Sequence, residues 1–357
     1  MKQKVSLDNR ISAFVGLGKV LRLAANSLIS EKPDFNEKYP LFFSALQEAS
    51  LYNPWFTPEN IAFALKAWEK TLSEESIKTW LDGYKTAIQS IDPKRVVVIM
   101  AGNIPLVGFH DFLCVVLSGN NFIGKLSSDD KILLPAIAEV LFGLEPGLRE
   151  NIQFTESTVK DFDAIIATGS NNSARYFEYY FSKYPHIIRK NRNGVAVLGG
   201  NESDETLKKL GFDICSYFGL GCRNVSKIFI PTGFDPKRLF IAIEPFVKTL
   251  SDHYKYMNNY SYQRSIFLLN DTKHLDNGVF IVTESEKYAS PIPVLYYQFY
   301  ENIEALKNKL SNDDGQIQCI ANEVFNNHKT VHIGNTQSPG LADYADGVDT
   351  MDFLVNL

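Results

Sequence analysis

Hydrophobic and polar positions follow two different patterns along this chain. Up to about residue 90, apolar side chains recur at the three- and four-residue spacings of a helix, as in residues 11–23 and 61–68. A Thr-Pro-Glu sequence at residues 57–59 precedes the second run and is typical of a helix start. After residue 93 the pattern changes, because residues 95–100 form a continuous apolar run rich in β-branched side chains. Such a run is typical of a strand buried on both faces of a parallel sheet.

Strand-like and helix-like segments then alternate through the rest of the chain. We expect helices over residues 105–117 and 131–142, and strands over residues 95–100, 121–126, 162–167, 227–231 and 293–297. Alternating strands and helices build βαβ units, which assemble into an open, mostly parallel sheet. A second α/β block begins near residue 200, without an internal repeat or flexible linker before it. The prediction is an α/β chain of two closely packed domains with a helical N-terminal region.

Composition and charge restrict the classes of function. The chain has 357 residues, 45% of them hydrophobic and 22% charged, which is typical of a globular protein. A net charge of −5 without a long basic stripe leads us to expect no nucleic-acid partner. We find no apolar signal segment in the first eight residues and no clean run of about 20 apolar residues, so we expect no membrane span and a cytoplasmic location. The four cysteines form no CxxC pair, which predicts reduced thiols and no metal site.

Three short motifs resemble ligand sites but have simpler interpretations. Gly16-Leu17-Gly18 lacks the third glycine and the preceding strand of a dinucleotide fingerprint, so we interpret it as a break between helices. The aspartates of residues 343–352 recur every third residue, which is not calcium-loop spacing and indicates a solvated face or a chain-end turn. The basic residues 189–192 are interpreted either as a phosphate contact or as a charged loop.

The segment around Cys222 carries the strongest chemical signal. Flexible glycines, Gly219 and Gly221, precede this cysteine, Arg223 follows it, and a strand-like run begins at residue 225. A lone cysteine in an apolar segment is usually inert packing, but a cationic neighbour and exposed N–H groups favour a thiolate. The N–H group at the cysteine also contributes to an oxyanion site. We therefore predict that Cys222 is a nucleophile and that the other three cysteines are structural: Cys114, Cys215 and Cys319.

The Gly-Leu-Gly-Cys segment resembles the nucleophile segment of the aldehyde dehydrogenase superfamily. Residues 102–106, Gly-Asn-Ile-Pro-Leu, are similar to its Trp-Asn-Phe-Pro-Leu element, whose asparagine amide helps to form the oxyanion hole. Residues 118–125 resemble the strand whose final lysine contacts the adenosine ribose of the cofactor. Residues 168–170 resemble a Thr-Gly-Ser turn near the pyrophosphate, and residues 197–200 stand where the superfamily has Glu-Leu-Gly-Gly. Each element is weak alone, but five in the same order are specific.

The greatest similarity is to the LuxC-type acyl-CoA reductase branch. It is carried by residues 189–198, 221–226 and 346–349, and the whole resemblance covers about residues 90–357. It implies an aldehyde-dehydrogenase-like fold, with an open Rossmann-type sheet and a second α/β catalytic domain. The expected boundaries are a helical N-terminal region over residues 1–90 that packs on the cofactor domain, a nicotinamide-cofactor domain over 91–200, a catalytic domain over 201–332 and a C-terminal tail over 333–357.

The resemblance implies reduction of a fatty acyl-CoA, or another acyl thioester, to the aldehyde by NADPH or NADH. Cys222 would form the acyl-enzyme and Asn103 would hold the oxyanion. His186 is a candidate acid/base, because imidazole titrates near neutral pH, with a structural role as the alternative. The expected cofactor contacts are Lys125, Ser127, Ser128, Thr168, Gly169, Ser170, Gly199 and Gly200.

Three residues depart from the superfamily pattern. Val197 replaces the glutamate that activates water in hydrolytic members, which predicts slow hydrolysis of the acyl-enzyme. Ser128 replaces a carboxylate that faces the ribose 2′-hydroxyl, which predicts that NADPH is accepted at least as well as NADH. Ala289 replaces a glutamate that contacts the nicotinamide ribose.

Other functions remain open from the sequence. The alternatives are an aldehyde-oxidising dehydrogenase, which in one form acylates coenzyme A, a cofactor-free cysteine acyltransferase and a catalytically inactive scaffold. The acyl donor is coenzyme A or a carrier protein, and the chain length of the acyl group is not determined. The resemblance also implies a homo-oligomer and makes an acyl-protein synthetase a candidate partner.

Overall fold

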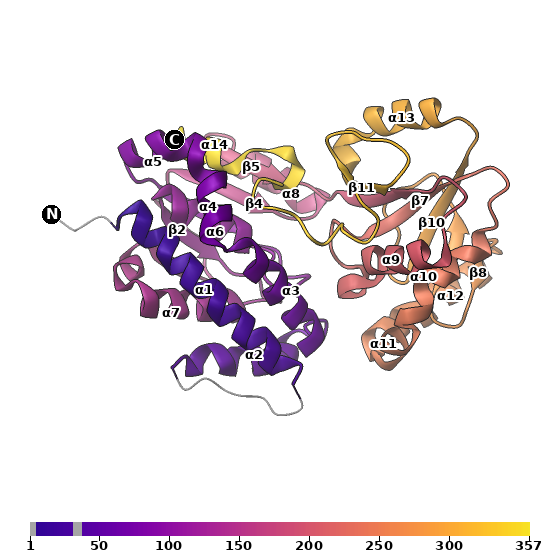
Figure 1. Cartoon of the computed structure of the whole chain (residues 1–357), viewed down its shortest axis with the longest axis horizontal. Coiled ribbons are helices and arrows are strands. Elements are labelled where there is room, and N and C mark those ends of the chain that lie inside the picture. Colours follow the sequence, from indigo (N-terminus) through magenta and orange to yellow (C-terminus); the bar gives the residue numbers. More distant parts are fainter. Residues whose placement is uncertain (1–4, 31–37) are drawn as a thin grey trace. The chain divides into compact units, whose positions relative to one another are not determined.

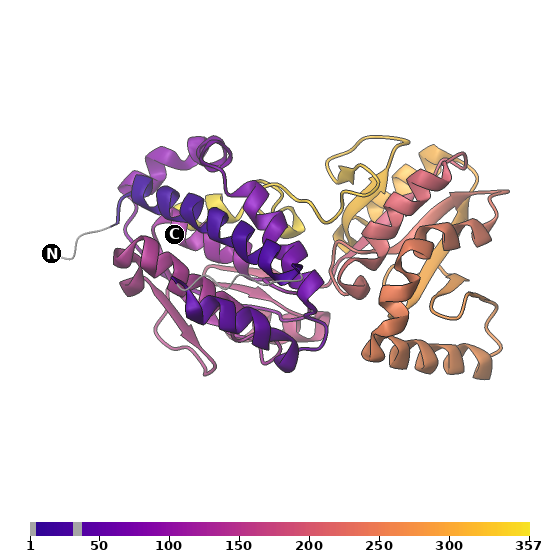
Figure 2. The same ribbon diagram turned by 60° about the horizontal axis from the view of Figure 1, so that its bottom comes forward.

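The structure is a computed structural model that describes residues 5–30 and 38–357. It divides the chain into two compact units (Figures 1 and 2). Residues 1–190 and 340–357 form the first unit, and residues 191–339 form the second. Residues 1–4 and 31–37, which belong to the predicted helical region and in part to the sequence argument about a signal segment, lie outside the described residues.

A parallel sheet of five strands forms the centre of the first unit, in the order β3-β2-β1-β4-β5. Its strands are β1 (Arg95–Ile99), β2 (Asn121–Lys125), β3 (Ile152–Thr155), β4 (Ala164–Thr168) and β5 (His186–Arg189). The β-branched side chains of β1 are buried on both faces, as their continuous apolar run predicts. The predicted α/β class with an open parallel sheet is confirmed.

Helices cover both faces of this sheet. The helices are α1 (Leu7–Leu28), α2 (Pro40–Tyr52), α3 (Pro58–Thr71), α4 (Glu74–Leu81), α5 (Lys85–Ser90), α6 (Phe109–Ser118), α7 (Leu133–Leu144), α8 (Asn171–Phe181) and α14 (Thr350–Val355). Helices α6 and α7 connect β1 to β2 and β2 to β3, so right-handed crossovers place them on one face, and α8, which connects β4 to β5, on the other. Helix α1 packs on α3, α6 and α7, so the N-terminal helices add a layer beside these two helices (Figure 1).

Helix α1 is continuous, so the predicted break at Gly16-Leu17-Gly18 is wrong. The two glycines instead permit close helix packing, because a Cβ atom at Gly16 would lie 3.2 Å from the Leu144 side chain and one at Gly18 would lie 3.1 Å from Leu72. Among the described helices, α1 alone has the length and mean hydropathy, 1.2, of a membrane span, and 56% of that window is buried inside the protein.

The second unit contains a sheet of seven strands, in the order β12-β11-β6-β7-β10-β9-β8. All its pairs are parallel except β8 with β9. Its strands are β6 (Asn193–Val197), β7 (Val225–Pro231), β8 (Leu275–Asp276), β9 (Ile281–Glu284), β10 (Val294–Tyr300), β11 (Ile317–Asn322) and β12 (Thr330–Val331). Its helices are α9 (Asp204–Cys215), α10 (Phe240–Ile243), α11 (Val247–Asp252), α12 (Tyr254–Leu269) and α13 (Ile303–Asn312).

The division between units differs from the expected boundaries. The second unit begins at Asn191 rather than near residue 200, because β6 pairs with β7 and β11 in the second sheet. Residues 340–357 return to the first unit, where α14 packs on α6 (Figures 1 and 2). The second unit is therefore an insertion into the first.

A buried ion pair holds this returning segment. The guanidinium of Arg189, the last residue of β5, donates to Asp111 in α6 at 2.5 Å and to the Thr350 hydroxyl at 3.0 Å. Both charged side chains are almost completely buried. Nearby, His110 bonds through Nε2 to the carbonyl of Leu341 at 2.9 Å. Of the basic residues 189–192, Arg189 is thus neither part of a free charged loop nor available to a phosphate, because it is committed to the core of the first unit.

We expect Asp111→Ala to lower the free energy of unfolding by about 3–5 kcal/mol, because it leaves the Arg189 cation buried without its carboxylate. The double variant Asp111→Ala/Arg189→Met should recover much of this loss, since no buried charge remains. Urea unfolding measures both values. The matched control is Glu178→Ala, which breaks the exposed pair of neighbouring Lys190 and should cost less than about 1 kcal/mol. Equal losses in the two single variants would contradict this account.

Candidate active site

Cys222 lies on a loop between α9 and β7 and is exposed, whereas Cys114, Cys215 and Cys319 are buried. Burial raises the pKa of the Cys114 and Cys215 thiols, which keeps them protonated. The cysteine predicted to be the nucleophile is thus the exposed one, and its nucleophilic role stays a prediction.

The backbone before Cys222 takes an unusual path. Tyr217, Phe218 and Gly219 have φ values of 51°, 58° and 81°, so three successive residues adopt the left-handed region. This conformation is costly for the two aromatic residues and is maintained by surrounding contacts. The Phe218 ring lies 4.2 Å from the His253 ring, centroid to centroid. The loop is therefore shaped by packing, and not by the flexibility of its glycines alone.

Asn224 fixes the two sides of the Cys222 turn. Its Oδ1 atom accepts from the Gly221 N–H at 2.8 Å, and its Nδ2 atom donates to the Ser216 carbonyl at 2.8 Å. The same amide reaches the Ile214 carbonyl at 3.3 Å near the end of α9. Because Asn224 is itself buried and follows Cys222 by two positions, its side chain ties the segment before Cys222 to the segment after it.

Arg223 and Asp213 brace the loop from the other side. The Arg223 Nε–H donates to the Thr336 carbonyl. Asp213, fully buried in α9, accepts from the N–H groups of Gly334 and Thr336 at 2.6 and 2.9 Å and from the Thr336 hydroxyl at 2.8 Å. Burial raises the pKa of this carboxyl group, which these hydrogen bonds and Arg223 oppose. These contacts tie both the Cys222 loop and α9 to residues 334–336.

Lys227 is a residue that the sequence interpretation missed. It is completely buried in β7, where Nζ donates to the Gln298 side chain at 2.7 Å and to the Glu286 carbonyl at 2.8 Å. Its Nζ also lies 4.8 Å from the centroid of the Phe229 ring and 5.0 Å from that of Tyr288. Burial lowers its pKa to about 8. The sequence signal that could have identified Lys227 is a lysine inside an apolar, strand-like run. Its contacts tie the strand after Cys222 to residues 286–288.

The first unit brings together two of the segments that the sequence singled out. A Cβ atom at Gly102 would lie 2.6 Å from the Ser127 Oγ atom, so the loop that carries Asn103 lies against the loop after β2. Asp130 joins the same loops, because its carboxylate accepts from the Leu106 N–H at 3.4 Å, and Leu106 has a left-handed φ of 63°.

The predicted cofactor residues of the first unit lie at one edge of its sheet. Lys125 ends β2 and pairs in register with Ile99, while Thr168 ends β4. The loops after β1, β2 and β4 therefore emerge at the carboxyl end, where the strand order changes direction and where α/β sheets bind ligands. Ser170 begins α8 and accepts from the Ser173 N–H at 3.1 Å. A Cβ atom at Gly169 would lie 2.9 Å from Ser173, so only glycine fits this turn.

His186 lies elsewhere in the first unit. It begins β5, where its register partner is Ile165, whereas Thr168 at the carboxyl edge pairs with Arg189. Its side chain is exposed, and Nδ1 bonds to the Tyr184 carbonyl at 2.8 Å. The structure does not bring His186 to the edge occupied by Lys125, so its acid/base role stays a prediction.

Val197 does not stand beside Cys222, which corrects the interpretation of the Val-Leu-Gly-Gly segment. Fully buried Val197 pairs with Phe229, four residues after the start of β7, whereas Cys222 precedes that strand. At about 3.3 Å per residue, this offset separates the two by more than ~13 Å along the strand. Position 197 therefore cannot supply a base at the acyl carbon, and the predicted slow hydrolysis loses its structural basis.

Gly199 and Gly200 follow Val197 to the same end of the sheet. A Cβ atom at Gly200 would lie 2.8 Å from Pro231, the last residue of β7. Both glycine N–H groups donate to the Glu202 carboxylate, at 2.5 and 3.0 Å. Since these amides already have a carboxylate acceptor of the same chain, this arrangement does not support their predicted contact with a cofactor.

Comparison with known proteins adds the family. A family model described as "Acyl-CoA reductase (LuxC)" matches residues 35–239, more than half of the chain. The long-chain acyl-protein thioester reductase of Photorhabdus laumondii subsp. laumondii is 22% identical over 172 residues, which are 44% of this chain and 36% of that relative. The match therefore spans little more than a third of the relative's length.

Solved structures show the same fold at low sequence identity. The indole-3-acetaldehyde dehydrogenase AldA of P. syringae, in complex with NAD+ and IAA, has a TM-score of 0.61 and 13% identity over 92% of this chain and 74% of its own. Aldehyde dehydrogenase 21 of Physcomitrella patens, in complex with the reaction product succinate, has the same TM-score and identity over 99% of this chain and 89% of its own. With an aldehyde dehydrogenase fold and a family match over most of the first unit and the Cys222 segment, this chain belongs to the LuxC acyl-CoA reductase family.

Proposed function

We propose that this chain reduces a fatty acyl-CoA, or a related acyl thioester, to the aldehyde through an acyl-Cys222 intermediate. The observation that carries the proposal is the exposure of Cys222 on a braced loop while the other three cysteines are buried. Membership of the LuxC family supports an acyl thioester as the substrate. Accessible thiols held in a fixed geometry are suited to nucleophilic attack on a carbonyl carbon.

The reductant in this proposal is a nicotinamide cofactor at the carboxyl edge of the first sheet. Lys125 supplies a cation at this edge, where its Nζ donates only weakly to the adjacent Leu126 carbonyl at 3.3 Å. Gly169 keeps the turn before α8 open, and Ser170 caps that helix, whose N-terminus favours an anionic group. These residues fit a dinucleotide, and a nicotinamide cofactor supplies a hydride when bound.

The chain's own residues account for the covalent steps. The Cys222 thiolate attacks the thioester carbonyl, the bond to coenzyme A breaks, and coenzyme A leaves as a thiolate that takes up a proton. The Asn103 amide and the Cys222 N–H are the proposed oxyanion donors, each worth about 2.7–4 kcal/mol in such sites. After hydride transfer to the acyl carbon, the carbonyl re-forms, the carbon–sulfur bond breaks and Cys222 leaves as the thiolate, which releases the aldehyde.

An aldehyde-oxidising dehydrogenase would use the same residues in reverse. Because Val197 lies far from Cys222 along β7, its side chain no longer argues against that direction. The acid/base role of His186, a homo-oligomer, an acyl-protein synthetase partner and a cytoplasmic location stay predictions.

Acylation of one cysteine is the first expected result. The protein is incubated with acyl-CoAs from eight to sixteen carbons, and the peptides are mapped by mass spectrometry. Only the Cys222 peptide should gain the acyl mass, and Cys222→Ala should abolish both acylation and NADPH oxidation. Cys114→Ala removes a buried thiol of the first unit and is the matched control that should remain acylated. Full turnover by Cys222→Ala would refute the proposed intermediate, and acylation without any nicotinamide binding would indicate an acyltransferase.

Cofactor preference tests the carboxyl edge. We expect NADPH to bind at least as tightly as NADH, because Ser128 carries no charge that would repel a 2′-phosphate. Lys125→Ala should weaken NADPH binding about tenfold or more, as expected for loss of a charged hydrogen-bond donor. The control is Lys94→Ala, since Lys94 precedes β1 at the opposite edge of the sheet. Equilibrium fluorescence titration measures the four affinities, and a Lys125→Ala protein with unchanged NADPH affinity would place the cofactor elsewhere.

Asp130, which joins the loops at this edge, should make the free energy of unfolding depend on pH. Burial raises the pKa of Asp130 from 3.8 to about 6. Between these pH values the folded state holds a proton on Asp130 that the unfolded state has lost. Protonation of Asp130 therefore stabilises the folded state at low pH, and this stabilisation is lost as the pH rises through about 6. The free energy of unfolding of the Asp130→Asn variant, relative to that of the parent, should therefore rise by on the order of 2–3 kcal/mol between pH 4 and pH 7. Exposed Asp129→Asn is the control. Urea unfolding at several pH values measures this, and parallel pH curves for parent and Asp130→Asn would be the contrary result.

A further inference from the structure

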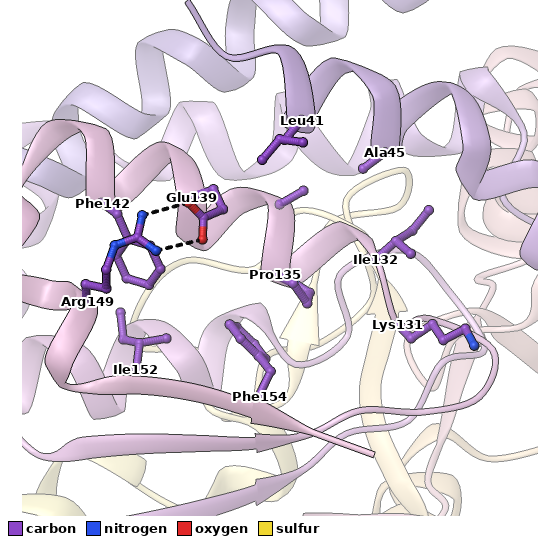
Figure 3. Close-up of a pocket in the computed structure, with 11 residues that line it drawn as sticks. Leu41, Ala45, Lys131, Ile132, Pro135, Glu139, Phe142, Arg149, Ile152 and Phe154 are labelled. Atoms are coloured by element: carbon purple, nitrogen blue, oxygen red, sulfur yellow. Dashed lines mark hydrogen bonds and ion pairs between the residues drawn. The ribbon is translucent and has the colours of Figure 1, made fainter.

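The first unit contains a groove that the proposed reaction does not use. Its volume is about 490 Å³, within the range of small-molecule sites. Figure 3 shows α7 along its base, with α2 on one side and β3 on the other. The lining is mostly apolar: Leu41, Ala45, Ile132, Pro135, Ala136, Phe142, Ile152 and Phe154. Leu41 is 65% exposed, so a ligand in the groove would cover apolar surface that now contacts water.

Each end of the groove carries a cation, and the two cations differ in how closely they are paired with a carboxylate of the chain. At one end the Arg149 guanidinium stacks on the Phe142 ring at 4.4 Å and donates twice to Glu139, at 2.8 and 3.2 Å. That charge is therefore neutralised within the wall. At the other end Lys131 approaches its carboxylate neighbour, Glu156, only to 3.8 Å, and both side chains are solvent-accessible. Figure 3 shows Lys131 at the end of α7 opposite to Arg149. The groove is thus mainly apolar, with the internally paired Glu139 and Arg149 toward one end. At the other end the Lys131 cation is only loosely paired with Glu156, and its Nζ lies 5.7 Å from the centroid of the Tyr52 ring.

We propose that this groove binds a fatty carboxylate, with the carboxylate at Lys131 and the alkyl chain along α7 toward Phe142. Ten helical residues separate Ile132 from Phe142, a length of about 15 Å, which matches an extended chain of about twelve carbons. Charge complementarity selects an anionic head over a neutral one. Because Arg149 is already paired with Glu139, Lys131 is the cation of the lining that a carboxylate head would contact, so one head group is favoured over two. The proposal does not rest on the reaction at Cys222, because every lining residue belongs to the first unit.

Calorimetric titration of the full chain with saturated fatty acids tests this site. Affinity should rise about fourfold for each added methylene up to about twelve carbons and then level off, because the chain leaves the groove at Phe142. Dodecanol, which lacks the charge, should bind about tenfold more weakly than dodecanoate. Lys131→Gln should weaken dodecanoate to the affinity of dodecanol, whereas Lys78→Gln, at an exposed lysine with its own carboxylate, should change nothing.

A filling variant separates this groove from any acyl site near Cys222. Pro135→Trp places an indole in the groove from the first turn of α7 and should abolish dodecanoate binding, with an unchanged thermal transition as evidence that the protein is folded. Cys222→Ala should bind dodecanoate as the parent does, whether or not the parent is a reductase. Binding that Cys222→Ala abolishes and Pro135→Trp preserves would overturn the proposal. Absence of binding, or self-association that Pro135→Trp disrupts, would also overturn it, the latter because a second copy would then occupy the groove.

Discussion

The first unit depends on the buried contact between Asp111 and Arg189. Taking two charges out of water costs several kcal/mol for each ion, and their attraction offsets this only in a favourable geometry. Here the guanidinium divides its donors between the carboxylate and the Thr350 hydroxyl, although Asp111 Oδ1 and Arg189 Nε have no hydrogen-bond partner among the described residues. The contact joins α6, β5 and α14. Since α6 begins directly after the loop of Asn103, the pair also fixes the helix that ends this loop.

Local patterns predicted part of the elements, including the strands β1, β2, β4, β7 and β10, and long-range pairing decided the sheet order and the return of the C-terminal segment. Continuous β-branched runs gave β1, β4 and β7 within two or three residues, because such runs are stable mainly as buried strands. The return of the C-terminal segment had no comparable signal. Thr350 and Arg189 meet across 161 positions, and neither residue is unusual in its local sequence. The glycines of α1 were misinterpreted for the same reason, since the Leu144 and Leu72 side chains that require them are distant in sequence.

The sequence singled out Cys222 as the candidate nucleophile, but it did not single out the residues that support the Cys222 loop. Glycines, an adjacent cation and a following strand are all local to Cys222, so the sequence singled it out. Asn224 and Lys227 act through the carbonyls of Ser216 and Glu286, and such roles exist only once the loop and strands have folded. The Leu-Gly-Gly similarity failed because a short motif does not define its strand register. Pairing of Val197 with Phe229 places that motif at the far end of β7.

The insertion of one unit into the other has a consequence for the order in which the chain folds during synthesis. Residues 191–339 are contiguous, so the second unit is complete before residues 340–357 have been made. The first unit has to wait for them, because α14 supplies the hydroxyl that Arg189 binds and Leu341 supplies the carbonyl that His110 binds. Nascent chains generally fold from the N-terminus onward. In this protein the unit that is begun first is therefore finished after the second, and its buried arginine stays incompletely bonded until residues 340–357 have been made.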